Sequence, residues 1–277
     1  MSLDPDATIK ALGIQWNSRE NTLFYSSGIS SIDTLTNRSM LSQITKLFDP
    51  LKLLGSVIVY AKIIMQICWK SGVTWDELLP LEIRDLWLSF QAQLKLIKHL
   101  KFSRCIIIPN PVDIQIHGFC DASEKDYGAC LYCRSVDAEE NIFVRLICAK
   151  SRVAPISSIS LPRLELCDAL LLARLYATLQ HFLLLEINGT YFWPDSIITL
   201  HWINTQPYLL RTFVVNRVGE IQRLTSQCHW QHVSSLDNPS DFLSRGQLPS
   251  EFLENIGKLV RLGYLKPSLH GQTGFWI

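Results

Sequence analysis

The hydrophobic pattern of this chain changes its period near Pro109 and Pro111. Before these prolines, apolar residues such as Leu41, Ile44 and Leu47 recur at a spacing that predicts amphipathic helices. After them, apolar and polar residues alternate, which predicts strands. Because the period changes where two prolines interrupt the chain, we expect a domain boundary close to residue 110.

The part before the boundary, residues 1–110, is expected to be mainly helical after a short extended start. Two alternating runs, residues 12–16 and 22–25, flank the polar run 17–21 and predict a hairpin. Pro80 is expected early in the third of the helices that follow, or as a break within it. The expected helices cover about residues 41–48, 57–68 and 75–99.

The second part, residues 111–246, mixes strand and helix patterns in an order that predicts a mixed α/β sheet with helices packed on it. Residues 247–277 are expected to be a C-terminal tail. The expected strands are 113–121, 127–134, 142–151, 190–193 and 229–233, and the expected helices are 162–185, 196–204, 212–225 and 239–244.

The composition excludes a disordered or membrane-spanning chain. Of 277 residues, 48% are hydrophobic and 18% are charged, which is enough apolar material for a buried core. The first ten residues lack the apolar stretch of a signal peptide. Two apolar stretches, residues 51–69 and 164–185, contain central charges that are costly in a bilayer. We therefore expect no membrane association and a cytoplasmic location.

The eight cysteines are too few for a disulfide scaffold in a chain of this length. Cys130 and Cys133 form a CxxC pair, but no second pair and no neighbouring His completes a metal site. We expect the cysteines to be packed as buried thiols.

Four acids fall at strand ends or helix starts, which is where mixed sheets build their sites. Asp121 ends the first strand of the sheet, Glu165 lies in the first turn of the long helix, Asp195 follows the fourth strand, and Asp241 opens the last short helix. Taken singly, each acid also fits a structural role: Asp195 and Asp241 as helix caps or first-turn acids, Glu165 as a solvated side chain, and Asp121 as a turn residue.

Several motifs occur together and in one order, namely Asp121-Ala122-Ser123 with Gly128-Ala129, Leu164-Glu165-Leu166, Asp195-Ser196, and Asn238-Pro239-Ser240-Asp241 with Ser244-Arg245. Together they resemble the ribonuclease H domain of retroelement reverse transcriptases, and most of all the BEL/Pao class of long-terminal-repeat retrotransposons, a family also called Pao retrotransposon peptidase. Further N-terminal motifs resemble the segment that joins the polymerase palm to that domain. These motifs include Leu12-Gly13-Ile14-Gln15-Trp16-Asn17, Phe48-Asp49-Pro50 and Trp75-Asp76.

The resemblance implies a domain organisation and a reaction. Residues 1–110 would be the end of the reverse transcriptase palm plus a helical thumb or connection, and residues 111–246 a ribonuclease H-like domain. Asp121, Glu165, Asp195 and Asp241 would bind two Mg²⁺ ions, or Mn²⁺, and cleave the RNA strand of RNA/DNA hybrids. Carboxylates without Cys or His suit Mg²⁺, and two metal ions can serve an in-line phosphodiester displacement.

The implied partners are the RNA/DNA hybrid and the rest of the Pol polyprotein, which are the polymerase palm and fingers and the integrase. No Asp-Asp pair is present, so the chain lacks a polymerase active site, and no Asp-Thr-Gly or Asp-Ser-Gly loop supports a peptidase. The net charge of +1 does not indicate a nucleic-acid binder. Residues 111–277 carry 14 basic and 16 acidic side chains, so they become net positive once the four proposed ligands are set aside.

The sequence departs from the family pattern at several positions, and one of them, Asp168, together with the missing polymerase palm leaves an alternative open. Cellular ribonucleases H carry a His in a loop before the last Asp, whereas here the connection before Asp241 is short and His232 is expected to be structural. Asp168 stands where the family tends to have Ala, one helical turn after Glu165. The alternative is a catalytically inactive retroelement remnant, or a co-opted nucleic-acid-binding module.

Overall fold

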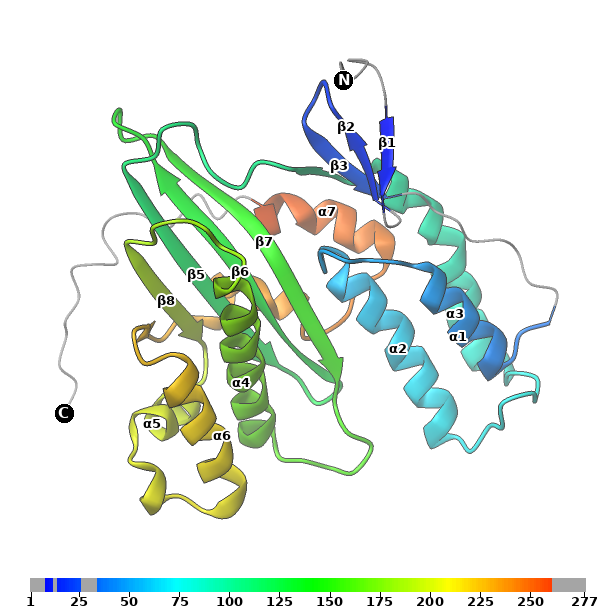
Figure 1. Ribbon diagram of the computed structural model, residues 1–277. Coiled ribbons are helices and arrows are strands. Elements are labelled where there is room, and N and C mark those ends of the chain that lie inside the picture. Colours follow the sequence, from blue (N-terminus) through cyan, green and yellow to red (C-terminus); the bar gives the residue numbers. More distant parts are fainter. Residues whose placement is uncertain (1–7, 12–13, 26–33, 261–277) are drawn as a thin grey trace.

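The first three described strands, with a fourth that lies after the N-terminal helices, form a small antiparallel sheet (Figure 1). The computed structural model describes residues 8–11, 14–25 and 34–260. The predicted hairpin is confirmed as β2 and β3, although residues 12–13 lie outside the described residues. The outer strands β1 and β4 were not predicted, because they are defined by their pairing with β2 and β3. The strands are β1 (Thr8–Ala11), β2 (Ile14–Asn17), β3 (Thr22–Tyr25) and β4 (Lys101–Ser103).

Three α-helices follow the hairpin: α1 (Asn37–Lys46), α2 (Gly55–Lys70) and α3 (Leu81–Gln93), the last continued by the 3₁₀ helix η1 (Leu94–His99). Thr36 and Ser39 close a capping box at the start of α1. The prediction that the third helix begins near residue 75 is wrong. Pro80 keeps an extended backbone and precedes the first helical residue, because a proline disfavours helical geometry in the residue before it.

The second sheet has five strands in the order β7-β6-β5-β8-β9. The first three in the chain pair antiparallel, while β5, β8 and β9 run parallel. The predicted last strand is shorter than expected, but the N–H groups of Gln231 and Val233 still bond to carbonyls of β8 residues. The strands are β5 (Asp113–Ala122), β6 (Asp126–Val136), β7 (Ile142–Val153), β8 (Gly189–Pro194) and β9 (His229–Trp230).

Three helices cover one face of this sheet: α4 (Leu161–Gln180), α5 (Ile197–Asn204) and α6 (Thr212–Leu224). The long helix ends five residues before its predicted end. Gly118 lets the sheet and helix approach closely, because a Cβ there would lie 2.7 Å from side-chain atoms of both Leu172 and Phe192. The predicted mixed sheet with flanking helices is therefore confirmed.

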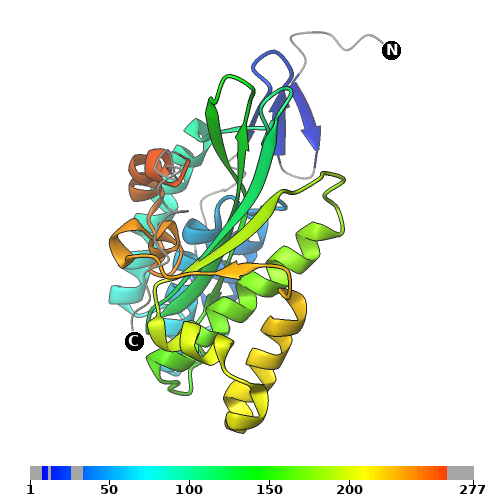
Figure 2. The same ribbon diagram turned by 90° about the vertical axis from the view of Figure 1, so that its left-hand side faces the viewer.

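The opposite face is covered by the N-terminal helices and by α7 (Pro249–Val260), so the sheet lies between two helical layers (Figure 2). Phe119, Tyr132 and Trp193 from the sheet share one core with Trp87 of α3 and Phe252 of α7. Part of the predicted tail is thus a helix, and residues 261–277 lie outside the described residues. The proposed division at residue 110 remains a prediction.

Helices of sufficient length and apolar character to cross a membrane are absent from the part of the chain that the structure describes.

Candidate nuclease site

Asp121 lies near the end of the central strand β5, and its side chain is 7% exposed. Its carboxylate accepts a hydrogen bond from the hydroxyl of Ser244. The side-chain amide of Asn238 donates to the backbone carbonyl of Cys120 over 2.9 Å, and this bond fastens the C-terminal segment to the end of the strand. Residues more than a hundred positions apart in the sequence therefore meet around Asp121.

Asp195 directly follows β8, the parallel neighbour of β5. Because Cys120 pairs with Pro194 in the register, Asp121 and Asp195 leave adjacent strands at the same edge of the sheet. The Asp195 carboxylate accepts a hydrogen bond from the Ser235 hydroxyl over 2.8 Å. The ring of His232 contacts the backbone carbonyl of Asp195 at 3.1 Å, so this His lies beside the acids.

Asp241 lies in the 3₁₀ helix η4 (Pro239–Phe242), whose first turn is capped by Asn238. Its carboxylate accepts a 2.7 Å hydrogen bond from the guanidinium of the exposed Arg245. This segment was predicted as a short helix over residues 239–244, and it forms a 3₁₀ helix that ends at Phe242.

Glu165 was predicted in the first turn of the long helix; it is the fifth residue of α4 and lies just past that turn, because the helix begins at Leu161. The hydroxyl of Ser196 donates a 2.6 Å hydrogen bond to the Glu165 carboxylate. The Ser196 hydroxyl oxygen also caps α5, because it accepts a hydrogen bond from the N–H of Thr199. Ser196 directly follows Asp195, so its hydroxyl links Glu165 of α4 to the end of β8.

Burial and repulsion alter the protonation of Asp121, one of these four acids. Burial is the largest influence on Asp121 and raises the pKa of its carboxyl to about 7. The Ser244 hydrogen bond opposes this shift, while the charges of Asp195 and Asp241 add to it. Asp195 and Asp241 therefore lie close enough to Asp121 for their charges to influence its carboxyl.

A fifth carboxyl lies behind these acids. Asp168 is 2% exposed, and its Oδ1 atom has no hydrogen-bond partner among the described residues. Burial raises the pKa of Asp168 well above its ordinary value, a hydrogen bond with the Cys120 thiol lowers it, and Asp121, Asp195 and Glu165 raise it further. Asp168 therefore lies close enough to Asp121, Asp195 and Glu165 to be influenced by the charges of all three.

The donor set is chemically suited to a hard divalent cation, because it consists of carboxylates. In the described residues, however, no three His, Cys, Asp or Glu side chains already form a metal-binding group. Each proposed ligand is held by a protein hydrogen bond, which comes from Ser244, Ser196, Ser235 or Arg245. The chemistry of the site fits Mg²⁺, and binding would have to replace some of these bonds.

The sequence reasoning missed the hydroxyl groups that hold the acids. Ser196 and Ser244 lie inside the motifs that carried the resemblance, but the motifs assign them no role. Ser235 had no sequence signal, because its contact with Asp195 joins residues 40 positions apart. Only the folded chain brings these pairs together.

The cysteines form no disulfide among the described residues, and most are buried or half-buried, whereas Cys105 is exposed. Cys130 and Cys133 belong to the cores on opposite faces of the sheet, because positions three apart on a strand point to opposite sides. The CxxC pair cannot share a metal ion.

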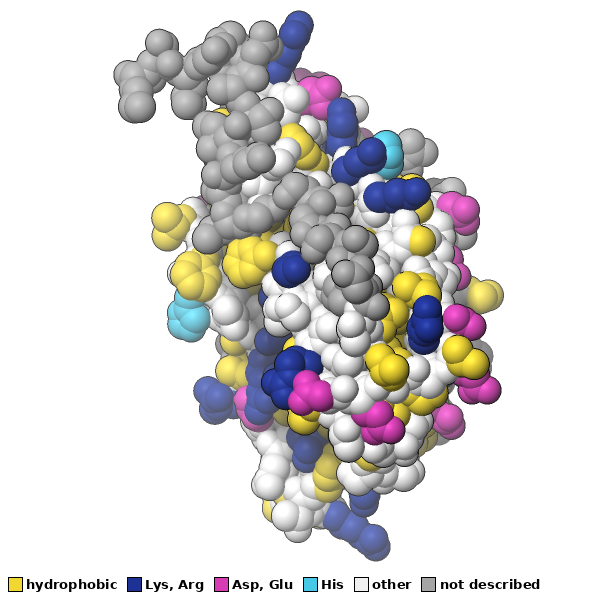
Figure 3. Space-filling model, turned by 90° about the vertical axis from the view of Figure 1, so that its right-hand side faces the viewer, with side chains coloured by type: hydrophobic (Ala, Val, Ile, Leu, Met, Phe, Trp, Pro, Cys, Tyr) yellow, Lys and Arg dark blue, Asp and Glu magenta, His cyan; other side chains and the backbone are white. Residues whose placement is uncertain are grey.

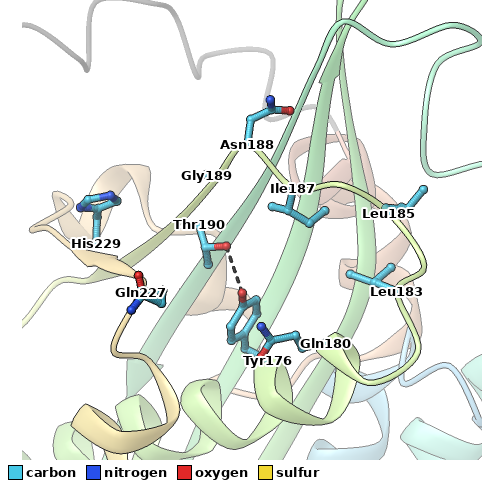
Figure 4. Close-up of a pocket in the computed structure, with 10 residues that line it drawn as sticks. All are labelled: Tyr176, Gln180, Leu183, Leu185, Ile187, Asn188, Gly189, Thr190, Gln227 and His229. Atoms are coloured by element: carbon cyan, nitrogen blue, oxygen red, sulfur yellow. Dashed lines mark hydrogen bonds between the residues drawn. The ribbon is translucent and has the colours of Figure 1, made fainter.

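A cavity of about 360 Å³ lies at the far end of β8 from Asp195 (Figure 4). The hydroxyls of Tyr176 and Thr190 meet at 3.2 Å across it, and Asn188, Gln227 and His229 lie at its edges. None of the described residues that line the cavity is an acid, so the carboxylate chemistry belongs to the other end of the sheet.

A central strand with parallel and antiparallel neighbours, helices on both faces and acids at one edge define a ribonuclease H-like α/β protein. The chain belongs to the family described as the Pao retrotransposon-like RNaseH-like domain, whose model matches residues 36–196. This match contains Asp121, Glu165 and Asp195, and it ends before Asp241. Among curated proteins, none matches the chain.

Solved structures of ribonucleases H are similar to about half of the chain. The N-terminal RNase H domain of a Mycobacterium tuberculosis protein, solved as a maltose-binding-protein fusion, is 12% identical, covering 49% of this chain and 96% of that one with a TM-score of 0.32. LC11-RNase H1 in complex with an RNA/DNA hybrid is 11% identical, covering 50% and 99% with a TM-score of 0.33.

A longer match is the foamy viral protease-reverse transcriptase in complex with dsDNA. It is 13% identical, covering 82% of this chain and 44% of that one with a TM-score of 0.29. Identities and TM-scores this low do not by themselves establish a shared fold, which here follows from the strand order and the family match.

Proposed function

We propose that this chain is the ribonuclease H of a BEL/Pao-type retrotransposon Pol polyprotein, a metal-dependent endonuclease that cleaves the RNA strand of RNA/DNA hybrids. The observation that supports this proposal is the placement of Asp121 and Asp195 at the same edge of adjacent parallel strands. Asp241 acts on the same Asp121 carboxyl electrostatically, and Glu165 acts on Asp168 behind them.

In the proposed mechanism, Asp121, Glu165, Asp195 and Asp241 would hold the cations. Two Mg²⁺ ions, or Mn²⁺, would supply the activated water and stabilise the leaving oxygen. Ser196, Ser235 and Ser244 orient the carboxylates before a cation binds. Arg245 neutralises Asp241 until a cation competes for it.

An RNA/DNA hybrid suits such a site because a shallow minor groove exposes its backbone and the 2′-hydroxyls of the RNA strand. Those groups distinguish the RNA strand from the DNA strand without reading bases. We expect cleavage with little sequence preference.

The helical N-terminal part is proposed to be the end of the palm plus the thumb or connection. Figure 3 shows apolar side chains at the surface of one face of the molecule. Trp75 and Leu78, in the connection between α2 and α3, and Leu81, at the start of α3, are exposed. These residues are candidates for contacts with the remaining Pol polyprotein, namely the palm, the fingers and the integrase. The cytoplasmic location stays a prediction.

The test uses a hybrid with a labelled RNA strand, the purified chain and its Asp121→Asn variant, with Mg²⁺ or with EDTA. We expect the parent to cleave RNA only with the metal and the variant to lose at least about two orders of magnitude in rate, as is typical when a group that stabilises a transition state is removed. Equal cleavage by both proteins, or none by the parent, would contradict the proposal.

A second candidate, an inactive remnant or co-opted nucleic-acid-binding module, is favoured by one observation. The buried, partly unpaired Asp168 lies directly behind the proposed site and adds a further carboxyl to it. Hybrid binding by the parent without metal-dependent cleavage would support this candidate. Cleavage restored by Asp168→Ala would identify Asp168 as the cause of the inactivity.

A further inference from the structure

Two segments without acids meet where helix α2 packs on the edge strand β7. Residues 50–75 contain three cations and no Asp or Glu, and residues 141–164 contain four cations and no Asp or Glu. The chain as a whole has almost equal numbers of acids and bases. Such a concentration of one charge sign is therefore a local property of this junction.

The two segments are in direct contact. A Cβ on Gly55, the first residue of α2, would lie 3.5 Å from the hydroxyl of Ser151 in β7. Farther along the same helix, Gln66 donates a 2.5 Å hydrogen bond to the carbonyl of Ala154, just beyond β7. The helix therefore follows the end of the strand. Ser151 faces α2, so its neighbours Lys150 and Arg152 point to the other side of this edge strand. The charge of Lys52 on the helical side still lowers the pKa of Lys150, so the cations flank the same edge.

Four exposed cations form what we call the α2–β7 basic surface: Lys52 and Lys62 on the helical side, and Lys150 and Arg152 on the strand. None of them makes an ion pair with a described carboxylate, whereas nearby Arg174 is occupied by Glu220. Burial and the charges of Arg152, Lys52 and Arg174 lower the pKa of Lys150, so these cations already repel one another.

The strand register connects this surface to the proposed catalytic acids. Asp121 pairs with Gly128, and Gly128 pairs with Ser151, which lies between Lys150 and Arg152. Neighbouring strands are about 4.8 Å apart, so the row from Asp121 to the basic edge spans about 10 Å. A duplex with one phosphate at the acids would have further backbone phosphates within reach of the cations.

We propose that the α2–β7 basic surface binds the phosphate backbone of the RNA/DNA hybrid, so that the helical part and the sheet hold one duplex together. This inference rests on the proposed function, because it assumes that a hybrid lies at Asp121. Unpaired, mutually repelling cations gain most from phosphate, whose binding releases counterions. Lys and Arg on β7 could alternatively only protect an exposed edge strand from aggregation.

The test measures binding of a fluorescein-labelled RNA/DNA hybrid by anisotropy in EDTA at several KCl concentrations. The paired variants are Lys150→Gln with Arg152→Gln, and Lys52→Asn with Lys62→Gln, where Asn suits the positive φ of residue 52. The matched control is Lys95→Gln with Lys98→Gln, which removes the same charge from exposed positions of η1. A comparison of the unfolding midpoints checks that all variants are folded.

We expect each pair of substitutions on the surface to make the slope of log affinity against log salt shallower by about two, while the control changes it little. The inference is overturned if the parent binds no hybrid, if only one of the two pairs matters, or if the control loses as much. Unchanged binding with increased aggregation of the β7 variant would assign these cations to edge protection and also overturn it.

The proposed nuclease activity is tested separately by the cleavage assay with Asp121→Asn. Cleavage that depends on Asp121, with hybrid binding unaffected by either pair of substitutions, would support the proposed nuclease and contradict the proposed role of the basic surface. Hybrid binding that depends on both pairs, without any cleavage, would do the reverse.

Discussion

Asp168 is a carboxyl group in α4, three residues after Glu165, and the fold buries it beneath the sheet edge. The pKa of Asp168 is raised in the folded state, so near neutral pH its carboxylate takes up a proton and becomes neutral when the chain folds. The sequence located this residue one helical turn after Glu165, but its burial against Cys120 depends on how α4 packs on β5. Its cost to stability can therefore be stated only from the structure.

We expect Asp168→Asn to stabilise the metal-free chain increasingly as the pH rises above the ordinary aspartate range. A raised acid pKa adds stability below the unfolded-state pKa, and this stability is lost as the pH rises towards the folded-state value. The difference in unfolding free energy between variant and parent should grow by about 1.4 kcal/mol per pH unit in that window. Urea unfolding at several pH values measures this, and a pH-independent difference would refute it.

Ser244 shows the same dependence on the fold. Its buried hydroxyl donates to Asp121 and lowers the pKa of that carboxyl. We expect Ser244→Ala to reduce the unfolding free energy by about 1 kcal/mol and to raise the Asp121 pKa above about 7. A carboxyl-carbon NMR titration reads this pKa. Ser250→Ala removes a hydroxyl that bonds to Gln93 instead, and it should leave the Asp121 titration unchanged.

At the scale of elements, the long periodic segments were predicted in type and position, whereas the short strands were predicted only in part. The three antiparallel strands, α4 and α6 show clear patterns over ten or more residues, and the structure confirms them. β1, β4 and β9 have two to four residues each, and they are defined by their pairing partners. The four acids were expected to converge because of the family resemblance, since each acid alone also fits a cap or turn.

Two glycines on the helical face of the sheet, one in the contact between β5 and α4 and one in α6, should respond oppositely to substitution by alanine. Gly118→Ala should destabilise the chain by about 1–3 kcal/mol, because its Cβ would overlap Leu172 and Phe192. Gly219→Ala, within α6 and open to space, should instead stabilise it by up to about 1 kcal/mol. Thermal unfolding of both variants gives the signs. A loss of stability at both positions, or at neither, would mean that this face is packed differently.

At the scale of the whole molecule, two further buried carboxyls add to the effect of Asp168 on the response to pH. Burial is the first cause that raises the pKa of both Asp121 and Asp126 to about 7. Without metal, the chain should therefore lose stability as the pH rises from about 4 towards 7, since the unfolded chain ionises first.

Added Mg²⁺ should reverse much of this loss if the acids bind it, because a ligand specific for the folded state stabilises that state. The measurement is the unfolding midpoint against pH with Mg²⁺ and with EDTA, using Asp121→Asn as the control. An equal gain from Mg²⁺ in the parent and the variant would show that the cation binds elsewhere.

The core under the second face of the sheet joins residues from both sides of position 110. Phe252 of α7 is 1% exposed and packs in this core with residues of the N-terminal helices and the sheet. We expect Phe252→Ala to cost about 3–5 kcal/mol and to lower the midpoint of one cooperative transition. Calorimetry checks this. Two separate transitions, only one of which moves, would support two independent domains.

The shared core also limits how a longer precursor of this chain could be processed. Phe119, Tyr132 and Trp193 would lose their cover if the helical part diffused away after a protease cut near residue 110. An exposed apolar sheet face favours aggregation or re-association. A cut at that place should therefore yield two pieces that stay associated, and release of the ribonuclease H-like domain alone would need a second protein to shield the uncovered strands.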